Sequence, residues 1–204
     1  MTDQIAQLRI WDLLFFVGFL IYVAIRGVFD RRAGKVPARI NRRDTLEFAL
    51  LVMVGVGSLG LPLLYLFTPW LAFADYPLPV LAPWIGAALM PAALWLFYRA
   101  HADLGVNWSV TLEIREGHRL VRDGVYRHLR HPMYAAILLF DVAQGLLLAN
   151  WLAGWAALAT FLLLYVVRVP REERLMEEVF AEEYRDYARC TGRLFPGLGK
   201  PRLG

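Results

Sequence analysis

Long, uninterrupted apolar blocks limit what this chain can fold into more than any other feature of its sequence. A helix that crosses a bilayer core about 30 Å thick needs about 17–25 predominantly apolar residues. Hydrophobic residues make up 58% of the 204 residues, above the roughly 45–50% of a soluble domain. This excess excludes a disordered chain and disfavours a soluble bundle of helices. Five blocks have about the required length, and they run roughly over 10–29, 46–67, 81–98, 132–149 and 151–167.

The basic residues alternate between the loops that join these blocks. Every lysine and arginine except Arg9 lies at the end of the first block or in the loop after it, between the third and fourth blocks, or after the fifth. Cytoplasmic loops of membrane proteins carry such an excess. The sequence therefore predicts an all-α, polytopic membrane protein with about five transmembrane helices, its N-terminus outside and its C-terminus cytoplasmic. The first block has no small-residue cleavage site after it, so we interpret it as a retained span.

Two polar stretches, 99–131 and 168–204, then share the cytoplasmic side. Each is too short to bury a core of its own. The second begins with a predicted amphipathic helix over 171–190, because apolar residues recur there at helical spacing. Its opposite face is mostly acidic and would be repelled by anionic lipid, so we expect the helix to pack against the 99–131 segment. The apolar side comprises Leu175, Met176, Val179, Phe180, Tyr184 and Tyr187.

The segment 118–134, HRLVRDGVYRHLRHPMY, concentrates groups that bind anions and flat rings. Its Asp-Gly pair predicts a turn, and Pro132 suits the first position of the fourth helix. His131 then lies beside the free N–H groups of that helix, where a ligand carboxylate or hydroxyl is stabilised. The HxxH spacing of two histidines is a weak metal motif with no cysteine nearby, so no metal site is predicted. Glycine-rich nucleotide motifs are absent from the sequence.

Three sequence blocks, in a fixed order around an apolar hairpin, point to a known family. They are LGVNWS at 104–109, the 118–134 segment, and RVPREERLMEEVFAEEYRDYARCTGRLFP at 168–196. With these blocks the chain resembles the isoprenylcysteine carboxyl methyltransferase family of integral membrane enzymes, which looks related to the phospholipid methyltransferases. The resemblance implies S-adenosyl-L-methionine as the cofactor, bound in a cytosolic pocket of the C-terminal half. We therefore divide the chain into N-terminal membrane helices, 1–98, and a catalytic region, 99–204, with a helical hairpin over 132–167.

The resemblance also implies roles for individual residues. Arg168 matches the arginine that holds the methyl-accepting carboxylate, and Arg130 is a second candidate for that catalytic role. The chain departs mildly from the family pattern at Ala135 and Ala136, where glycine is frequent, and at 180–184, where the usual FGxEY reads FAEEY. The positions that match cofactor-binding residues are His118, Arg119, Leu120, Val121, Tyr126, His131, Pro132, Met133, Tyr134 and Glu172.

Several assignments stay open at this point. Either Glu172 or its neighbour Glu173 could be the carboxylate that contacts the cofactor. A carboxylate acceptor is ionised at neutral pH and needs no general base, whereas an amine or thiol acceptor needs one, for which Glu173 and His128 are the candidates. Asp141 and Gln144 lie three residues apart on one face of the fourth block, where buried polar groups are costly. They face either a pocket or a neighbouring helix.

The expected function is methyl transfer to a lipophilic small molecule or lipidated acceptor, most simply a carboxylate such as that of isoprenylcysteine. The acceptor enters from the lipid bilayer and the cofactor from the cytosol; neither a metal nor a nucleic acid is expected as a partner. Two alternatives remain. One is an NADPH-dependent sterol-type membrane reductase, which shares an RHP-tyrosine element, and the other is a non-enzymatic transporter or scaffold. The EERLMEEVFAEEY block favours the methyltransferase.

Overall fold

Helices make up most of the protein. The computed structural model describes residues 9–33, 38–41, 45–105, 113–115 and 119–197. The α-helices are α2 (Ile10–Ala33), α3 (Thr45–Gly55), α4 (Leu61–Phe67), α5 (Ala82–Leu104), α6 (Pro132–Leu147) and α7 (Trp151–Cys190). A π-helix, η1 (Val56–Gly60), joins α3 to α4, and two short 3₁₀ turns are η2 (Ala72–Ala74) and η4 (Gly124–Arg127).

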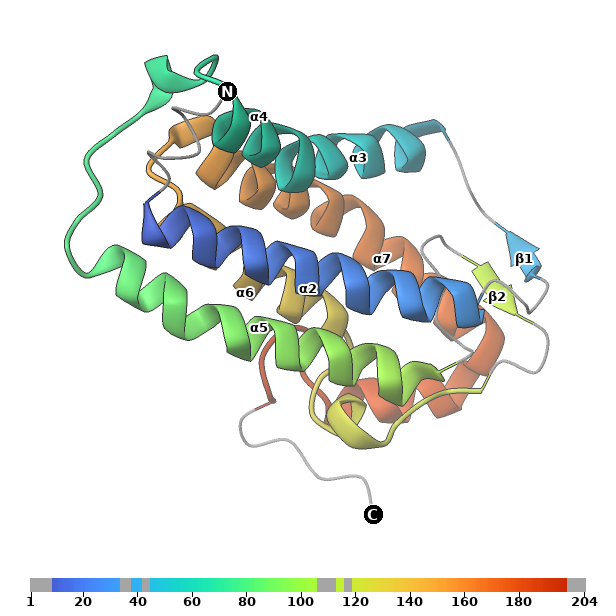
Figure 1. The fold of residues 1–204 in the computed structure, drawn as a ribbon. Helices are drawn as coiled ribbons and strands as arrows, with labels where there is room; N and C mark the ends of the chain where they lie inside the picture. Colours follow the sequence, from blue (N-terminus) through green and yellow to red (C-terminus); the bar gives the residue numbers. More distant parts are fainter. Residues whose placement is uncertain (1–8, 34–37, 42–44, 106–112, 116–118, 198–204) are drawn as a thin grey trace.

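Five helical rods lie alongside one another, formed by α2, the continuous α3–η1–α4, α5, α6 and the first half of α7 (Figure 1). Each rod contains one of the five predicted apolar blocks. Buried apolar side chains such as Phe15, Met90 and Phe140 form the core between them. Three rods are long and apolar enough to cross a membrane, namely Ile10–Arg32, Thr45–Phe67 and the helix Trp151–Cys190. Because α6 has only 16 residues and α5 does not meet the same criterion, the count of five spans stays a prediction.

Asn150 forms hydrogen bonds with both connections that carry no basic residue, namely the loop between α4 and α5 and the turn between α6 and α7. Its side-chain oxygen accepts hydrogen bonds from the backbone N–H groups of Leu152 and Ala153, so it caps the start of α7. Its side-chain nitrogen donates to the Leu71 carbonyl at 2.6 Å and to the Asp75 carboxylate at 2.7 Å. The loop between α4 and α5 therefore meets the α6–α7 turn at one end of the bundle (Figure 1).

The opposite end of the bundle holds the polar segments. There β1 (Ala38–Asn41) pairs antiparallel with β2 (Glu113–Arg115), a short ladder that the sequence did not predict. The segment 119–131 also lies at this end, and its Arg130 N–H donates to the Gly192 carbonyl at 2.7 Å. The fold is thus all-α, as predicted, apart from one two-stranded ladder, and the basic segments share one end of the molecule.

The predicted amphipathic helix 171–190 is not a separate element. Its first part continues the fifth rod through Pro170, and the helical segment α7 is kinked at Ala181, a non-helical residue at φ +45°. Tyr184 and Tyr187 are buried, as predicted. The Tyr187 hydroxyl donates to the backbone carbonyls of Tyr126 at 2.7 Å and Leu129 at 3.3 Å. The helix therefore packs against the 119–131 segment, which confirms that expectation.

The π-helix η1 marks a close approach between the second rod and α7. A side chain at Gly57 would come within 2.9 Å of the Thr160 hydroxyl and 3.0 Å of the Ala156 carbonyl oxygen, so only glycine fits there. Gln144 of α6 donates from its side-chain nitrogen to the Gly57 carbonyl at 3.2 Å and to the Ala153 carbonyl at 2.6 Å. Of the two open readings for Gln144, the structure supports a contact with neighbouring helices.

Candidate active site

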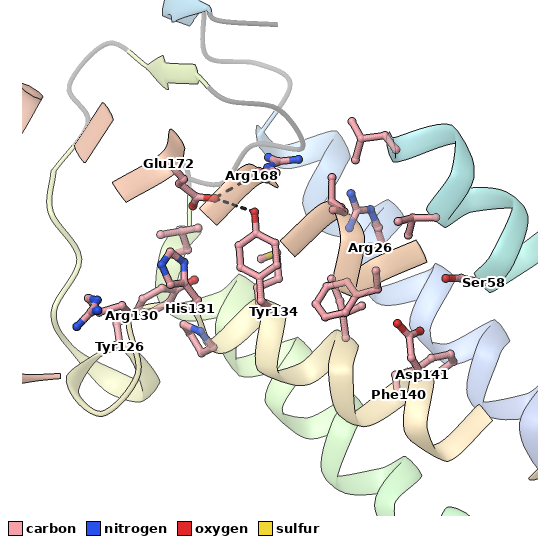
Figure 2. A pocket seen from close by; sticks show the side chains of 18 of the residues that line it. Arg26, Ser58, Tyr126, Arg130, His131, Tyr134, Phe140, Asp141, Arg168 and Glu172 are labelled. Carbon is pink, nitrogen blue, oxygen red and sulfur yellow. Dashed lines mark hydrogen bonds and ion pairs between the residues drawn. The ribbon is translucent and has the colours of Figure 1, made fainter. Parts of the chain in front are cut away.

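A cavity of about 470 Å³ lies between α2, α3–η1, α6, α7 and the segment 119–131. Figure 2 shows its charged and aromatic side chains. We call one part the polar end, and it is lined by Arg119, Leu120, Val121, Tyr126, Arg130, His131, Pro132, Met133, Tyr134, Arg168, Glu172, Tyr184 and Tyr187. The other part, the bundle end, is lined by Phe19, Tyr22, Val23, Arg26, Leu51, Val54, Gly55, Ser58, Leu59, Ile137, Phe140, Asp141, Phe161 and Leu164.

A chain of polar contacts crosses the polar end. The Tyr134 hydroxyl of α6 donates to the Glu172 carboxylate of α7 at 2.8 Å. The same carboxylate lies 3.9 Å from Nε of Arg168, one helical turn earlier (Figure 2). Arg168 is buried, and its Nη1 lies 3.3 Å from the carboxylate of Glu47 on α3. The buried Nε of Arg168 has no hydrogen-bond partner among the described residues, so it is available to a ligand carboxylate.

Glu173 stands outside this chain of contacts and instead contacts the side chains of two arginines and a histidine. Its carboxylate accepts from Arg130 Nε at 3.1 Å, contacts His131 Nε2 at 3.2 Å, and accepts from Arg193 Nη2 at 2.6 Å. Burial on its own would raise the pKa of Glu173, but the hydrogen bonds from His131 and Arg193 and the nearby positive charges outweigh it and lower that pKa to about 2. Glu173 is therefore an ionised anchor for these side chains.

Arg130 and His131 are held mainly by the protein. Arg130 Nη1 donates to the carbonyls of Ala188 at 2.8 Å and Thr191 at 2.6 Å, and so fixes the end of α7. His131 precedes the first residue of α6, as predicted, and its backbone N–H donates to the Arg193 carbonyl at 3.1 Å. Its ring lies edge-on to Tyr134, with 5.5 Å between the ring centroids. These contacts orient the start of α6 toward the cavity.

The turn before α6 is also fixed. Gly124 has a φ of +58°, which glycine adopts without strain, so the predicted Asp-Gly turn is present. The next N–H, that of Val125, donates to the Asp103 carboxylate of α5 at 2.9 Å. Tyr126 then points inward, where its hydroxyl donates to the Ala100 carbonyl at 3.3 Å. Burial, with a smaller contribution from the charge of Glu172, raises the pKa of Tyr126 well above its usual value, so this hydroxyl keeps its proton.

The structure brings the sequence-predicted site residues together around one cavity. Both catalytic candidates, Arg168 and Arg130, line it, and so do all but one of the predicted cofactor-binding residues. The exception is His118, which lies outside the described residues. Within the part of the chain that the structure describes, no three His, Cys, Asp or Glu side chains are grouped so that they could hold a metal ion. The site is thus built from arginines, tyrosines, a histidine and a glutamate.

Comparison with known proteins agrees with this geometry. Residues 84–178 match the model of the isoprenylcysteine carboxyl methyltransferase (ICMT) family. A protein-S-isoprenylcysteine O-methyltransferase of Dictyostelium discoideum is 29% identical over 121 residues, which cover 56% of this chain and 49% of that relative. Form A of the enzyme from Arabidopsis thaliana is 32% identical over 112 residues, 55% of this chain and 54% of the relative. Over these residues the chain is similar to the ICMT family.

The match covers part of this chain and part of each relative. Form B of the Arabidopsis thaliana enzyme is 31% identical over 86 residues, 41% of this chain and 44% of the relative, so the chain spans about half the length of the curated relatives it matches. The matched region contains α6 and most of α7, and hence Tyr134, Arg168 and Glu172. Its long apolar helices and its similarity to the ICMT family indicate an integral membrane protein.

Sequence reasoning missed the contributions from outside the ICMT match. Glu47, Arg26 and Ser58 belong to the first two rods, and none lies in a recognised motif. Glu47 holds Arg168, while Arg26 and Ser58 line the bundle end. One signal was present for Glu47, because it is the single charged residue in the apolar block 46–67. An ionisable residue inside a span is costly and marks a functional contact by default.

Proposed function

We propose that this protein transfers a methyl group from S-adenosylmethionine to the carboxylate of a lipophilic acceptor, such as an isoprenylcysteine on a small molecule or a lipidated protein. The observation that supports this proposal best is the single cavity that joins a charged, aromatic end to a mostly apolar end inside the bundle. A hydrophilic cofactor fits the first part and a lipid chain the second. With the N-terminus outside, the polar end faces the cytosol.

The polar end has groups that suit each part of the cofactor. When bound, S-adenosylmethionine supplies a methyl group on a positively charged sulfur. Glu172 lies at the cavity with a carboxylate that suits an ammonium group or ribose hydroxyls. Tyr126 and Tyr134 offer aromatic faces to adenine or to a cation, an attraction of about 0.5–2 kcal/mol. His131 and the backbone N–H groups at the start of α6 suit a carboxylate.

The acceptor carboxylate is assigned to Arg168. Its buried Nε, which has no hydrogen-bond partner among the described residues, can donate to one carboxylate oxygen, and the planar guanidinium favours a second, parallel hydrogen bond. Because the carboxylate is already ionised at neutral pH, the protein has to align the reacting atoms and exclude water, and alignment alone can lower the barrier by about 7–11 kcal/mol. Arg130 is better suited to positioning, since its Nε and Nη1 already contact Glu173 and two backbone carbonyls.

The proposal is tested by cofactor binding and methyl transfer on the same purified protein. We expect Glu172→Ala and His131→Ala to weaken the binding of radiolabelled S-adenosylmethionine by about tenfold, since each loses a polar contact to a charged ligand. Glu177→Ala, which removes an exposed glutamate from the same helix, is the matched control and should keep wild-type affinity. Wild-type binding no tighter than that of Glu172→Ala and His131→Ala would contradict the cofactor assignment, as would displacement of the label by NADPH.

The methyl-transfer measurement uses the variant Arg168→Lys. Lysine keeps the charge but lacks the planar pair of donors, so cofactor binding should survive while transfer to S-farnesylcysteine falls by about tenfold or more. Equal turnover of Arg168→Lys and wild type would remove Arg168 from the reaction. Transfer from the labelled cofactor is counted in the lipid phase after extraction.

A further inference from the structure

Asp141 of α6 is a buried acidic residue at the cavity for which the proposed function has no role. Its side chain lines the bundle end of the cavity, and the residue is only 1% exposed. Neither carboxyl oxygen has a hydrogen-bond partner among the residues that the structure describes. Figure 2 shows Asp141 near Ser58, away from Glu172 and His131 at the polar end. The structure thus places an unsatisfied acidic group in the part of the cavity that suits a lipid chain.

The next polar residue along α6 shows that this is not the ordinary use of a polar group in a helical bundle. Gln144 lies three residues further on and donates two hydrogen bonds to the backbone of η1 and α7. Those contacts join helices. The Asp141 carboxyl makes no hydrogen bond to any residue in the described part of the chain. A buried carboxyl without partners destabilises a fold, and a leucine would pack there at lower cost. A group of this kind is typical of a site where the missing partner comes with a ligand.

The position of Asp141 on α6 sets the distance at which that partner would lie. Asp141 follows Tyr134 by seven residues, so at 1.5 Å per residue it is about 10 Å further along the helix axis. Tyr134 contacts Glu172, which lies beside Arg168, where the proposed function places the methyl-accepting carboxylate. An acceptor that extends from Arg168 into the bundle therefore passes Asp141 about 10 Å from its reacting end.

We infer that Asp141 selects an acceptor whose lipid chain carries a hydrogen-bond donor, a hydroxyl group, about 10 Å from the methylated carboxylate. This inference rests on the proposed function and adds the substrate class to it. A carboxyl oxygen of Asp141 accepts the hydrogen bond in either protonation state. The wall around it is otherwise mostly apolar, with Phe19, Ile137 and Phe140 on the same part of the cavity. A plain hydrocarbon chain would leave the buried carboxyl unsatisfied, so it binds less well than a hydroxylated one.

The test compares acceptors of equal length on the wild-type protein. The probes are S-dodecylcysteine, the same molecule with a hydroxyl near the middle of the chain, and the same molecule with a hydroxyl at the chain end. We expect kcat/KM for the mid-chain hydroxyl to exceed that for the plain chain and for the end hydroxyl by about tenfold, mostly through KM. Equal kcat/KM for the three probes overturns the inference but leaves the proposed function intact. No methyl transfer to any probe overturns both.

Variants then connect the preference to Asp141 itself. Asp141→Leu should reverse the order of plain and mid-chain hydroxyl probes, and Asp141→Asn, which keeps an accepting oxygen, should retain part of the preference. Ile137→Val is the matched control, because it alters the same wall one turn away without removing a polar group, and it should keep the wild-type ratio. An unchanged ratio in Asp141→Leu overturns the inference. Thermal unfolding gives a second readout: a structural Asp141 would lower the Tm of Asp141→Leu, whereas a residue kept for its ligand leaves it unchanged or raised.

Discussion

Glu172 and Glu173 are neighbours in sequence, yet their carboxylates have different surroundings. An α-helix turns by about 100° per residue, so adjacent side chains point to different sides. Glu172 lines the cavity and accepts a hydrogen bond from Tyr134. Glu173 does not line it, and its carboxylate is occupied by Arg130, His131 and Arg193. The geometry therefore favours Glu172 over Glu173 as the residue that meets a cofactor.

Arg168 owes its position to a residue from the other half of the chain. Glu47 of α3 is buried and lies 3.3 Å from Nη1 of Arg168. Glu172 lies on the Nε side of the same guanidinium at 3.9 Å. Two carboxylates from different helices thus hold one arginine at the cavity.

Ala181 occupies a position where the backbone favours glycine. Its φ is +45°, and it is the only non-glycine residue with a positive φ in the described ranges. The sequence pattern that this chain resembles has glycine at the corresponding place in FGxEY. We expect Ala181→Gly to stabilise the protein by about 1 kcal/mol, because a side chain in this region costs about 1–2 kcal/mol. For a chain of this size that corresponds to a rise in Tm of about 2–4 °C.

The matched control for Ala181→Gly is Ala188→Gly, which introduces glycine into a regular part of the same helix. That change should lower stability by about 0.5–1 kcal/mol, because glycine gains more freedom on unfolding. Thermal unfolding in one detergent compares the two variants. If Ala181→Gly lowers the Tm as much as Ala188→Gly does, the backbone at 181 is not strained.

At the scale of elements, the features that depend on local chemistry could be predicted from the sequence. Pro132 starts α6 and Asn150 separates α6 from α7, as expected. The π-helix η1 and the β1–β2 ladder could not be predicted, because both depend on partners far away in the chain. The Gly57 carbonyl is bound by Gln144, 87 residues later, and β1 pairs with a strand more than 70 residues away. Nor did the sequence show that helix 171–190 continues α7, because Pro170 normally ends a helix.

The junction of α6, α7 and the segment after α7 depends on the charge of Glu173. The pKa of Glu173 is about 2 in the folded protein, below the value near 4.5 of a free glutamate. The unfolded chain therefore binds a proton at Glu173 more tightly than the folded protein does. The stabilisation is therefore complete above about pH 4.5 and is lost as the pH falls toward 2. After allowance for solvent screening at this half-buried group, we expect a contribution of about 1–2 kcal/mol.

Thermal unfolding between pH 6 and pH 3 measures this contribution. The Tm of the wild type should fall further over that interval than the Tm of Glu173→Gln, because the variant has no charge to lose at this position. At pH 6 the variant should be less stable than the wild type. Glu177→Gln, an exposed glutamate on the same helix, should follow the wild-type profile. Parallel profiles for wild type and Glu173→Gln would show that the cluster does not depend on the charge of Glu173.

At the scale of the whole molecule, the cavity is built from both halves of the chain. The sequence motifs lie in the C-terminal half, and the division at residue 98 stays a prediction about folding units. The walls of the bundle end come largely from the first two rods, including Arg26 and Ser58. No motif marks these residues, because an apolar helix can line a lipid cavity with many different side chains. The residues of the polar end could therefore be predicted from the sequence, whereas those of the bundle end became visible only in the fold.

The orientation in the membrane is the last prediction, and the sole cysteine of the chain makes it testable. In a Cys190→Ala background, a single cysteine is introduced at Phe73, which is 80% exposed in the loop between α4 and α5, or at Arg189, whose side chain is 70% exposed near the end of α7. Because the basic segments are expected in the cytoplasm, a membrane-impermeant maleimide should label Phe73→Cys on intact cells and Arg189→Cys only after permeabilisation.

The reverse labelling pattern would contradict more than the orientation. The polar end of the cavity lies with Arg168 and Glu172 at the same end of the bundle as the segment 119–131 and the C-terminal part of α7. If Arg189→Cys were labelled on intact cells, this end would face outward and the cofactor would have to reach it from outside the cell. A site that depends on cytosolic S-adenosylmethionine could not work in that orientation, so the labelling experiment also tests the proposed function.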